Sequence, residues 1–259
     1  MPEAAVLTRV EGGVGRIELD RPANGNAIDA RLADDFAASV TKVIEDPTVR
    51  VIVLQSGGRV FCGGGDLAAV AAADDPSAYI GGIATAFSEG LALLAESGKL
   101  SIAAVQGVTA GAGLAIVLTA DLVVASDRAT FVGAYGAVGL TPDCGVSYFL
   151  PRVVGPRRAA ELLLTRRVVD ATVALDWALV NEVVPADALG DRVTELAESI
   201  VSGAVHAVEP TKRLLARAET SDYRSHLAAE ADAIALAAKG DATRALIDGF
   251  VRDRAARKR

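Results

Sequence analysis

Two glycine-rich stretches decide the fold of this 259-residue chain: Phe61-Cys62-Gly63-Gly64-Gly65-Asp66 and Gly107-Val108-Thr109-Ala110-Gly111-Ala112-Gly113. A run of apolar, partly β-branched residues precedes each of them, at Val51–Leu54 and Ile102–Val105, and a helical pattern follows each. Glycines let a ligand approach the main chain, and N–H groups at the start of a helix carry partial positive charge. Two such turns facing each other would form an oxyanion hole on an α/β fold.

Other interpretations of these turns fit less well. A phosphate-binding P-loop needs Lys and Ser or Thr after its last glycine, whereas Asp66 follows Gly65. A dinucleotide-binding turn needs a third glycine, which Gly111-Ala112-Gly113 lacks. For either turn alone, a purely structural role stays open.

Outward from these turns, strand and helix patterns alternate and then give way to helices. The patterns predict strands at 6–10, 15–19 and 122–125, helices at 29–46 and 78–95, and mainly helices from 155 to 251 around a strand-like 180–184. The sequence therefore predicts a β/α core over residues 1–187 and a helical region over residues 188–259.

The composition excludes several classes of protein. With 51% hydrophobic residues the chain should fold around a core, and a net charge of −7 disfavours a nucleic-acid partner. Residues 101–120 carry no charge, but Gln106 and glycines interrupt them, so we expect no membrane partner. Cys62 and Cys144 cannot form a disulfide framework, which makes a cytoplasmic location the simplest expectation. We expect no metal site, because no His/Cys cluster has ligand spacing.

Four motifs in order resemble the crotonase superfamily, also called the enoyl-CoA hydratase/isomerase family, over nearly the whole chain. They are Asp20-Arg21-Pro22 with Asn26-Ala27, Phe61 to Leu67, Gly107 to Asp121, and Gly139 to Gly145 leading to Leu150-Pro151-Arg152. The resemblance implies a spiral core of ββα turns and a C-terminal helical trimerisation region. It also implies a homotrimer or dimer of trimers that binds an acyl-CoA thioester and needs no cofactor besides the coenzyme A of that substrate.

The resemblance assigns roles to individual residues. The N–H groups of Gly65 and Ala112 would hold the thioester oxygen. Hydratases of the family use two glutamates, but those positions hold Ala115 and Tyr135 here, and neither is a competent base near pH 7. Asp143 stands where several members carry a catalytic aspartate, among them isomerases and a dehalogenase in which it is the nucleophile.

Further positions are implied to bind substrate, and some have plainer roles. Asp66 should also cap the helix after the first turn, Asp143 has capping of the helix near Gly145 as an alternative, and Cys144 should be a packing residue. The acyl pocket is expected around 71–83 and Tyr148, and the basic tail at 252–259 is a candidate for the CoA phosphates. The substrate-binding set is Ala27, Gly63, Asp66, Leu67, Tyr135 and Tyr148.

These residues predict a reaction that needs only one base. Asp143 would remove a proton from C2 of a 3-enoyl-CoA, the oxyanion hole would hold the dienolate, and the carboxyl would return the proton at C4. The alternatives are isomerisation of a ring epoxide on an aromatic acyl-CoA, enoyl-CoA hydration by overall similarity, and binding of acyl-CoA without catalysis.

Overall fold

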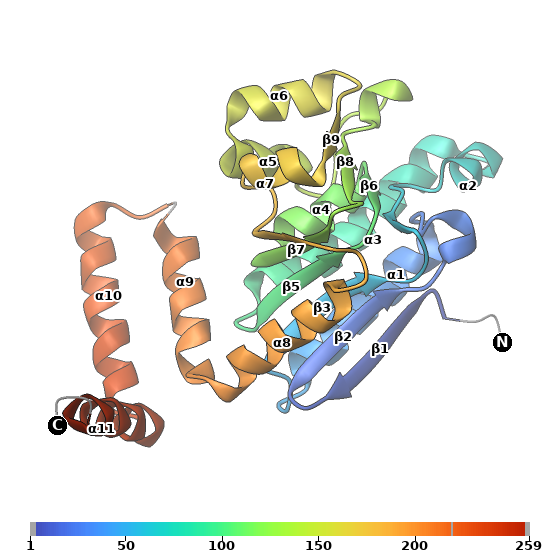
Figure 1. Ribbon diagram of the computed structural model, residues 1–259. Coiled ribbons are helices and arrows are strands. Elements are labelled where there is room, and N and C mark those ends of the chain that lie inside the picture. Colours follow the sequence, from blue (N-terminus) through green and yellow to red (C-terminus); the bar gives the residue numbers. More distant parts are fainter. Residues whose placement is uncertain (1–3, 219, 257–259) are drawn as a thin grey trace.

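A computed structural model describes residues 4–218 and 220–256. The core holds two sheets with helices packed around them (Figure 1). The strands are β1 (Val6–Glu11), β2 (Val14–Leu19), β3 (Val51–Ser56), β4 (Val60–Cys62), β5 (Leu100–Val105), β6 (Val108–Ala110), β7 (Leu122–Ser126), β8 (Thr130–Val132), β9 (Val168–Asp170) and β10 (Glu182–Val184). The predicted α/β class is confirmed.

The helices are spread over the whole chain, and the longest is α3 with 21 residues. They are α1 (Ala30–Glu45), α2 (Leu67–Ala72), α3 (Pro76–Glu96), α4 (Gly113–Thr119), α5 (Val146–Val154), α6 (Pro156–Leu164), α7 (Ala171–Asp176), α8 (Leu189–Ser202), α9 (Val208–Ala218), α10 (Tyr223–Ala238) and α11 (Asp241–Ala256). Single 3₁₀ turns lie at Pro22–Asn24, Tyr135–Ala137 and Val205–Ala207.

The larger sheet has the strand order β1-β2-β3-β5-β7-β10 and is parallel from β2 onward. Both of its faces are covered, which explains the continuous apolar run of β3. Val51 and Val53 point toward a layer closed by α8, whereas Ile52 and Leu54 point into the main core with α1. Alternate side chains of β3 thus pack into two different hydrophobic cores, one on each face of the sheet.

The smaller sheet has the order β4-β6-β8-β9 and positions the glycine turns. β4 and β6 pair in parallel, with Val60 opposite Val108 and Cys62 opposite Thr109. Because the carboxyl ends of parallel neighbours meet at one edge of a sheet, the turns after β4 and β6 lie side by side.

Helix α3 is the one helix among the described residues with the length and apolar composition of a membrane span, which is weak evidence of one. It packs against α1, where the rings of Phe36 and Phe87 have centroids 4.7 Å apart. Residues 101–120, the uncharged stretch, form β5, β6 and α4 instead of one long helix.

The C-terminal helices α9 to α11 stand away from the sheets (Figure 1). Helix α8 still belongs to the core, since Leu189, Val193 and Ala197 are buried against the sheet. An ion pair of 2.8 Å between the Lys212 ammonium and the Asp121 carboxylate ties α9 to the core. The division after residue 187 stays a prediction, and residues 257–259 of the basic tail lie outside the described residues.

Candidate active site

The two glycine turns touch each other at Gly64. This residue has φ +87°, and a Cβ atom placed on it would lie 2.9 Å from the carbonyl oxygen of Ala110. A side chain there would therefore meet both a left-handed backbone and a fixed main-chain neighbour. Glycine at this position is what allows the two turns to approach.

The amides proposed for the oxyanion hole are unengaged. Ile28 forms a bridge beside Gly65: its N–H donates to the Gly64 carbonyl at 2.7 Å, and its carbonyl accepts from the Asp66 N–H at 2.8 Å. Within residues 4–218 and 220–256, no protein acceptor takes the N–H of Gly65 or of Ala112. Both residues line the same cavity. The two donors are thus available to a ligand in that cavity.

Asn26 holds the loop that precedes the first turn. Its side chain is fully buried, donates to the carbonyls of Gly57 at 2.9 Å and Val60 at 2.7 Å, and accepts from the Arg21 N–H at 2.9 Å. Asn tolerates the left-handed backbone found here, φ 51°, better than most residues do. One buried amide thus joins the loop at Arg21 to the start of β4.

Replacing Asn26 with alanine is expected to lower the free energy of unfolding by about 3 kcal/mol, because the three hydrogen bonds of this buried side chain to main-chain groups are lost. Urea denaturation measures this. Asn24→Ala is the matched control, since Asn24 is exposed in the same loop. Equal stabilities of the two variants would contradict the role of Asn26.

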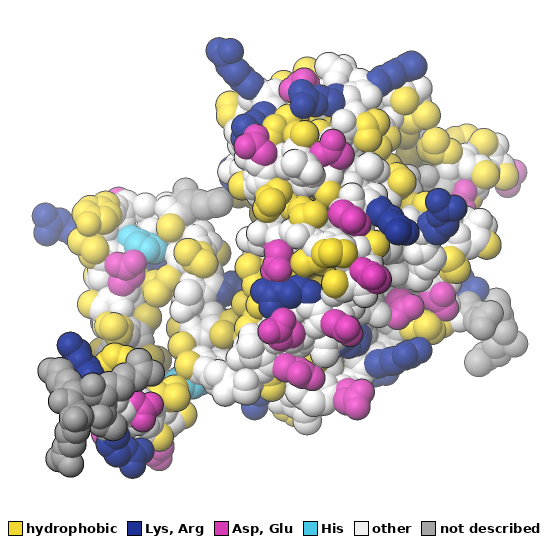
Figure 2. Space-filling model, viewed as in Figure 1, with side chains coloured by type: hydrophobic (Ala, Val, Ile, Leu, Met, Phe, Trp, Pro, Cys, Tyr) yellow, Lys and Arg dark blue, Asp and Glu magenta, His cyan; other side chains and the backbone are white. Residues whose placement is uncertain are grey.

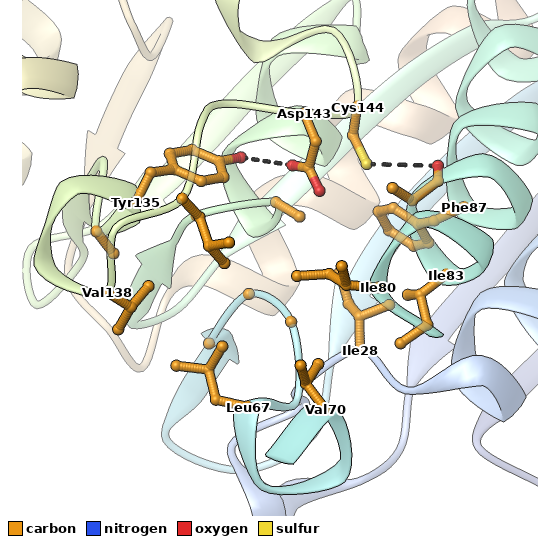
Figure 3. Close-up of a pocket in the computed structure, with 18 of the residues that line it drawn as sticks. Ile28, Leu67, Val70, Ile80, Ile83, Phe87, Tyr135, Val138, Asp143 and Cys144 are labelled. Carbon is orange, nitrogen blue, oxygen red and sulfur yellow. Dashed lines mark hydrogen bonds between the residues drawn. The ribbon is translucent and has the colours of Figure 1, made fainter. Parts of the chain in front are cut away.

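A cavity of about 190 Å³ opens beside the glycine turns. Figure 3 shows Asp143 and Tyr135 at one side of it, with Leu67 and Val70 opposite and Ile83 from α3 on a further wall. Asp143 is the only carboxylate that lines this cavity in the described part of the chain. The candidate active site therefore contains one acidic group.

Tyr135 donates its hydroxyl hydrogen to Oδ1 of Asp143 across 2.8 Å. Burial, together with the neighbouring charge of Asp143, raises the pKa of Tyr135 well above its ordinary value. Tyr135 consequently stays a neutral phenol and hydrogen-bond donor at physiological pH. In Figure 3 the second oxygen of Asp143 is directed toward the cavity.

The backbone on both sides of this pair is strained. Ala134, directly before Tyr135, has φ 62°, and Cys144, directly after Asp143, has φ 50°. Left-handed conformations cost non-glycine residues about 1–2 kcal/mol and persist where the surroundings enforce them. Such strain is concentrated at functional sites, which supports a role for the pair beyond packing.

The alternative that Asp143 caps a helix is wrong. The N-cap of α5 is Gly145, and no side chain caps that helix. The Asp143 contact with α5 is through its main-chain carbonyl, which accepts from the Val146 N–H at 3.0 Å. Its carboxylate is thus left for Tyr135 and the cavity.

Cys144 lines the cavity without the properties of a nucleophile. Its thiol lies 3.8 Å from the Ala84 carbonyl, and burial, with the Asp143 charge as the next cause, raises its pKa to about 12. Burial also raises the pKa of Cys62 to about 12, and both thiols are free. Protonated thiols of this kind are packing residues.

The structure gathers six of the nine predicted site residues at the cavity: Gly63, Gly65, Leu67, Ala112, Tyr135 and Asp143. Asp66 instead caps α2, accepting from the Ala69 N–H at 3.1 Å, and contacts Arg21 at 3.5 Å. The carbonyl of Ala27 accepts from the same guanidinium at 2.6 Å. Neither Asp66 nor Ala27 lines the cavity.

Tyr148, which is expected near the acyl pocket, does not line this cavity. Tyr148 is 48% exposed, and its ring packs under the Arg152 guanidinium, 3.6 Å from the ring centroid. It follows Asp143 by only five residues, but α5 turns its side chain away from the cavity. Within residues 4–218 and 220–256, no three His, Cys, Asp or Glu side chains form a metal cluster.

Sequence reasoning missed much of the cavity wall. The expected range 71–83 includes Ile80 and Ile83, but the wall continues along α3 to Ala84 and Phe87. Val138 and Leu140, from the loop between the Tyr135 and Asp143 positions, complete it. The apolar spacing of 80, 83, 84 and 87 is the signal that indicates one helical face.

Comparisons with known proteins identify the relatives of this chain. The sequence profile described as enoyl-CoA hydratase/isomerase matches residues 9–256. A carnitinyl-CoA dehydratase of Proteus mirabilis is 37% identical over 215 residues, which make up 83% of this chain and 80% of that protein. A 1,2-epoxyphenylacetyl-CoA isomerase of Escherichia coli is 32% identical over 257 residues, 96% of each chain.

A solved structure shares the whole fold. The crystal structure of an enoyl-CoA hydratase/isomerase from Mycobacterium abscessus superimposes with a TM-score of 0.93 at 31% identity, covering 96% of this chain and 97% of that one. The similarity therefore extends over both sheets and the helices around them.

Proposed function

Because this chain belongs to the enoyl-CoA hydratase/isomerase family, we propose that it converts a 3-enoyl-CoA into a 2-enoyl-CoA with Asp143 as the base. The observation that carries the proposal is the single carboxylate of the cavity, held by the Tyr135 hydroxyl at 2.8 Å. A double-bond shift needs one group that takes and returns a proton, and this site offers one.

The proposed reaction has two proton transfers and no net change in composition. The free oxygen of Asp143 takes a proton from C2, the C2 electrons form a dienolate with the thioester carbonyl and the 3,4 double bond, and negative charge develops on the carbonyl oxygen. Reprotonation at C4 by the same carboxyl restores the carbonyl and leaves the double bond at C2–C3. Asp143 ends the cycle ionised.

The two free amides supply the stabilisation that the dienolate needs. The N–H groups of Gly65 and Ala112 donate to no other group in the described residues and line the cavity. Fixed main-chain donors of this kind are worth about 3–4 kcal/mol each when aimed at a developing oxyanion. Since an α-proton of a thioester is weakly acidic, most of the barrier reduction must come from these donors.

Hydration is the less favoured alternative, although one relative is named a carnitinyl-CoA dehydratase. Adding water across a double bond requires one group to activate the water and a partner to supply a proton. The positions of the family's two glutamates hold Ala115, which is fully buried, and Tyr135, whose pKa is raised. We expect crotonyl-CoA hydration to be slow.

Isomerisation of a ring epoxide on an aromatic acyl-CoA is a second candidate. Its specific support is the relative named 1,2-epoxyphenylacetyl-CoA isomerase, which aligns over 96% of both chains. That reaction would use the same carboxylate and differ in the shape of the acyl group. Binding without turnover is the third candidate.

A turnover panel distinguishes these reactions. Purified protein is given 3-hexenoyl-CoA, crotonyl-CoA and 1,2-epoxyphenylacetyl-CoA, and products are separated by liquid chromatography with mass detection. The proposal expects 2-hexenoyl-CoA as the main product of the first substrate and little 3-hydroxybutyryl-CoA. Tight binding of all three without turnover would support a binder instead.

Tyr135→Phe is expected to lower the rate of isomerisation by about 10-fold to 100-fold, the range for a lost charge-assisted hydrogen bond. The variant keeps the ring that packs in the cavity wall but frees Oδ1 of Asp143. Initial rates of 3-hexenoyl-CoA conversion by the two proteins measure this effect. An unchanged rate would remove Tyr135 from the mechanism.

We also propose that the chain assembles with further copies of itself, as a trimer or a dimer of trimers. It exposes 14056 Å², whereas a monomer of 26.5 kDa typically exposes about 10,700 Å². The excess, roughly 3,400 Å², lies in the range of obligate interfaces. Large apolar side chains are exposed on α9 to α11: Leu215, Tyr223, Leu227, Ile234, Leu236, Leu246, Ile247, Phe250 and Val251.

Hydrophobic side chains, drawn in yellow, are visible on the helices that stand away from the core (Figure 2). Leu246→Glu with Phe250→Glu is expected to reduce the mass measured by light scattering from that of an oligomer to that of one chain. The control is Arg244→Glu, a charge change on the same helix. A monomeric unmodified protein would contradict the assembly.

A further inference from the structure

The side chains that line the cavity offer an acyl group almost no hydrogen-bonding partner. The Tyr135 hydroxyl is taken by Asp143, and the Cys144 thiol lies on the Ala84 carbonyl. The second Asp143 oxygen and the amides of Gly65 and Ala112, which also lie at the wall, are used by the proposed reaction. Beyond the reacting carbons, the side chains that an acyl chain meets are apolar.

The apolar wall comes largely from two helices, α2 and α3. Leu67 and Val70 belong to α2, and Ile80 and Ile83 to α3. Phe87, one turn farther along α3, is fully buried and packs on Phe36, so its side chain cannot easily move aside. The wall around this part of the cavity has no charged side chain apart from Asp143 in the described residues.

We infer that this cavity selects uncharged acyl groups that carry no hydroxyl, carboxylate or ammonium beyond the reacting carbons. The inference rests on the proposed function in one respect, that the acyl end of the thioester enters this cavity. A polar substituent loses its hydration on entry and finds no partner, which destabilises the complex. The substrate class is therefore a hydrocarbon acyl-CoA, linear or cyclic.

Binding of saturated thioesters tests this selection without any chemistry. Dissociation constants are measured by calorimetry for hexanoyl-CoA, 5-hydroxyhexanoyl-CoA, 6-hydroxyhexanoyl-CoA and adipoyl-CoA, which ends in a carboxylate. We expect both hydroxyl compounds to bind about 10-fold to 100-fold more weakly than hexanoyl-CoA, the range by which an apolar pocket rejects an added hydroxyl. Adipoyl-CoA should bind more weakly still, because its charge is desolvated.

A polar substitution in the cavity wall should reduce the preference for hexanoyl-CoA over its hydroxyl derivatives. Val70→Thr replaces a methyl group of the half-buried α2 side chain with a hydroxyl of similar size. It should therefore weaken the binding of hexanoyl-CoA and reduce the difference in affinity between hexanoyl-CoA and the two hydroxyl compounds. Val153→Thr is the matched control on α5, outside the cavity. The dissociation constants of this control variant should equal those of the unmodified protein.

The outcomes separate this inference from the proposed function. Equal affinities for hexanoyl-CoA and its hydroxyl derivatives, or no binding of any thioester, would overturn the inference. A protein that shows the expected order but fails to isomerise 3-hexenoyl-CoA would keep the inference and lose the proposed reaction. Isomerisation of 3-hexenoyl-CoA together with equal affinities would keep the proposed reaction and overturn the inference.

Discussion

Asp143→Asn is expected to bind acyl-CoA as the unmodified protein does and to lose isomerisation by a factor of about 10² to 10⁴, the usual contribution of a general base. The amide has the shape of the carboxylate and can still accept from the Tyr135 hydroxyl, which lies 2.8 Å from Oδ1. It cannot accept a proton from C2. The loss should therefore appear in kcat, with the affinity for saturated thioesters unchanged.

Conversion of 3-hexenoyl-CoA, followed by the ultraviolet absorbance of the conjugated product, measures this effect. Asp176→Asn is the control, since Asp176 is an exposed residue of α7 that pairs with Arg158. Circular dichroism should show the same fold for both variants. Full turnover by Asp143→Asn would mean that another group is the base.

Gly64→Ala is expected to reduce kcat/KM by about 10² to 10³, the loss reported for one oxyanion-hole donor. A Cβ atom at Gly64 would lie 2.9 Å from the Ala110 carbonyl oxygen, and the backbone there has φ +87°. The first turn must then move away from the second, which separates the amides of Gly65 and Ala112. Thermal stability should also fall.

The matched control is Gly81→Ala. Gly81 lies in α3, where an added Cβ meets nothing within 4 Å, so alanine should preserve activity and favour the helix by about 1 kcal/mol. The same assay and a thermal melt compare the two variants. If Gly64→Ala kept full activity, the contact between the turns would have no part in catalysis.

The long elements of the fold were predictable because their periodicity is strong. The apolar spacing of Leu32, Phe36, Val40 and Val43 indicated α1, and the β-branched run at 51–54 indicated β3. The four strands of the smaller sheet were not predicted, since each has three residues and two lie inside glycine-rich stretches. Three residues are too few to show alternation, so their pairing had to come from the structure.

The candidate site was partly predictable for a similar reason. The glycine turns and Asp143 stand in motifs, and their positions along the chain identified them. The hydrogen bond between Tyr135 and Asp143 depends on the course of the loop between them, including the left-handed backbone of Ala134 and Cys144. The outward direction of Tyr148 likewise depends on where α5 begins, which Gly145 determines.

The most direct test of the central claim, that one carboxyl carries the proton from C2 to C4, is isotope transfer. 3-Hexenoyl-CoA with deuterium at both C2 positions is converted in ordinary water, and the product is analysed by mass spectrometry at low conversion. The account predicts that deuterium from C2 appears at C4 in part of the product, because Asp143 holds it inside an apolar cavity. Product whose C4 hydrogen comes entirely from water would contradict it.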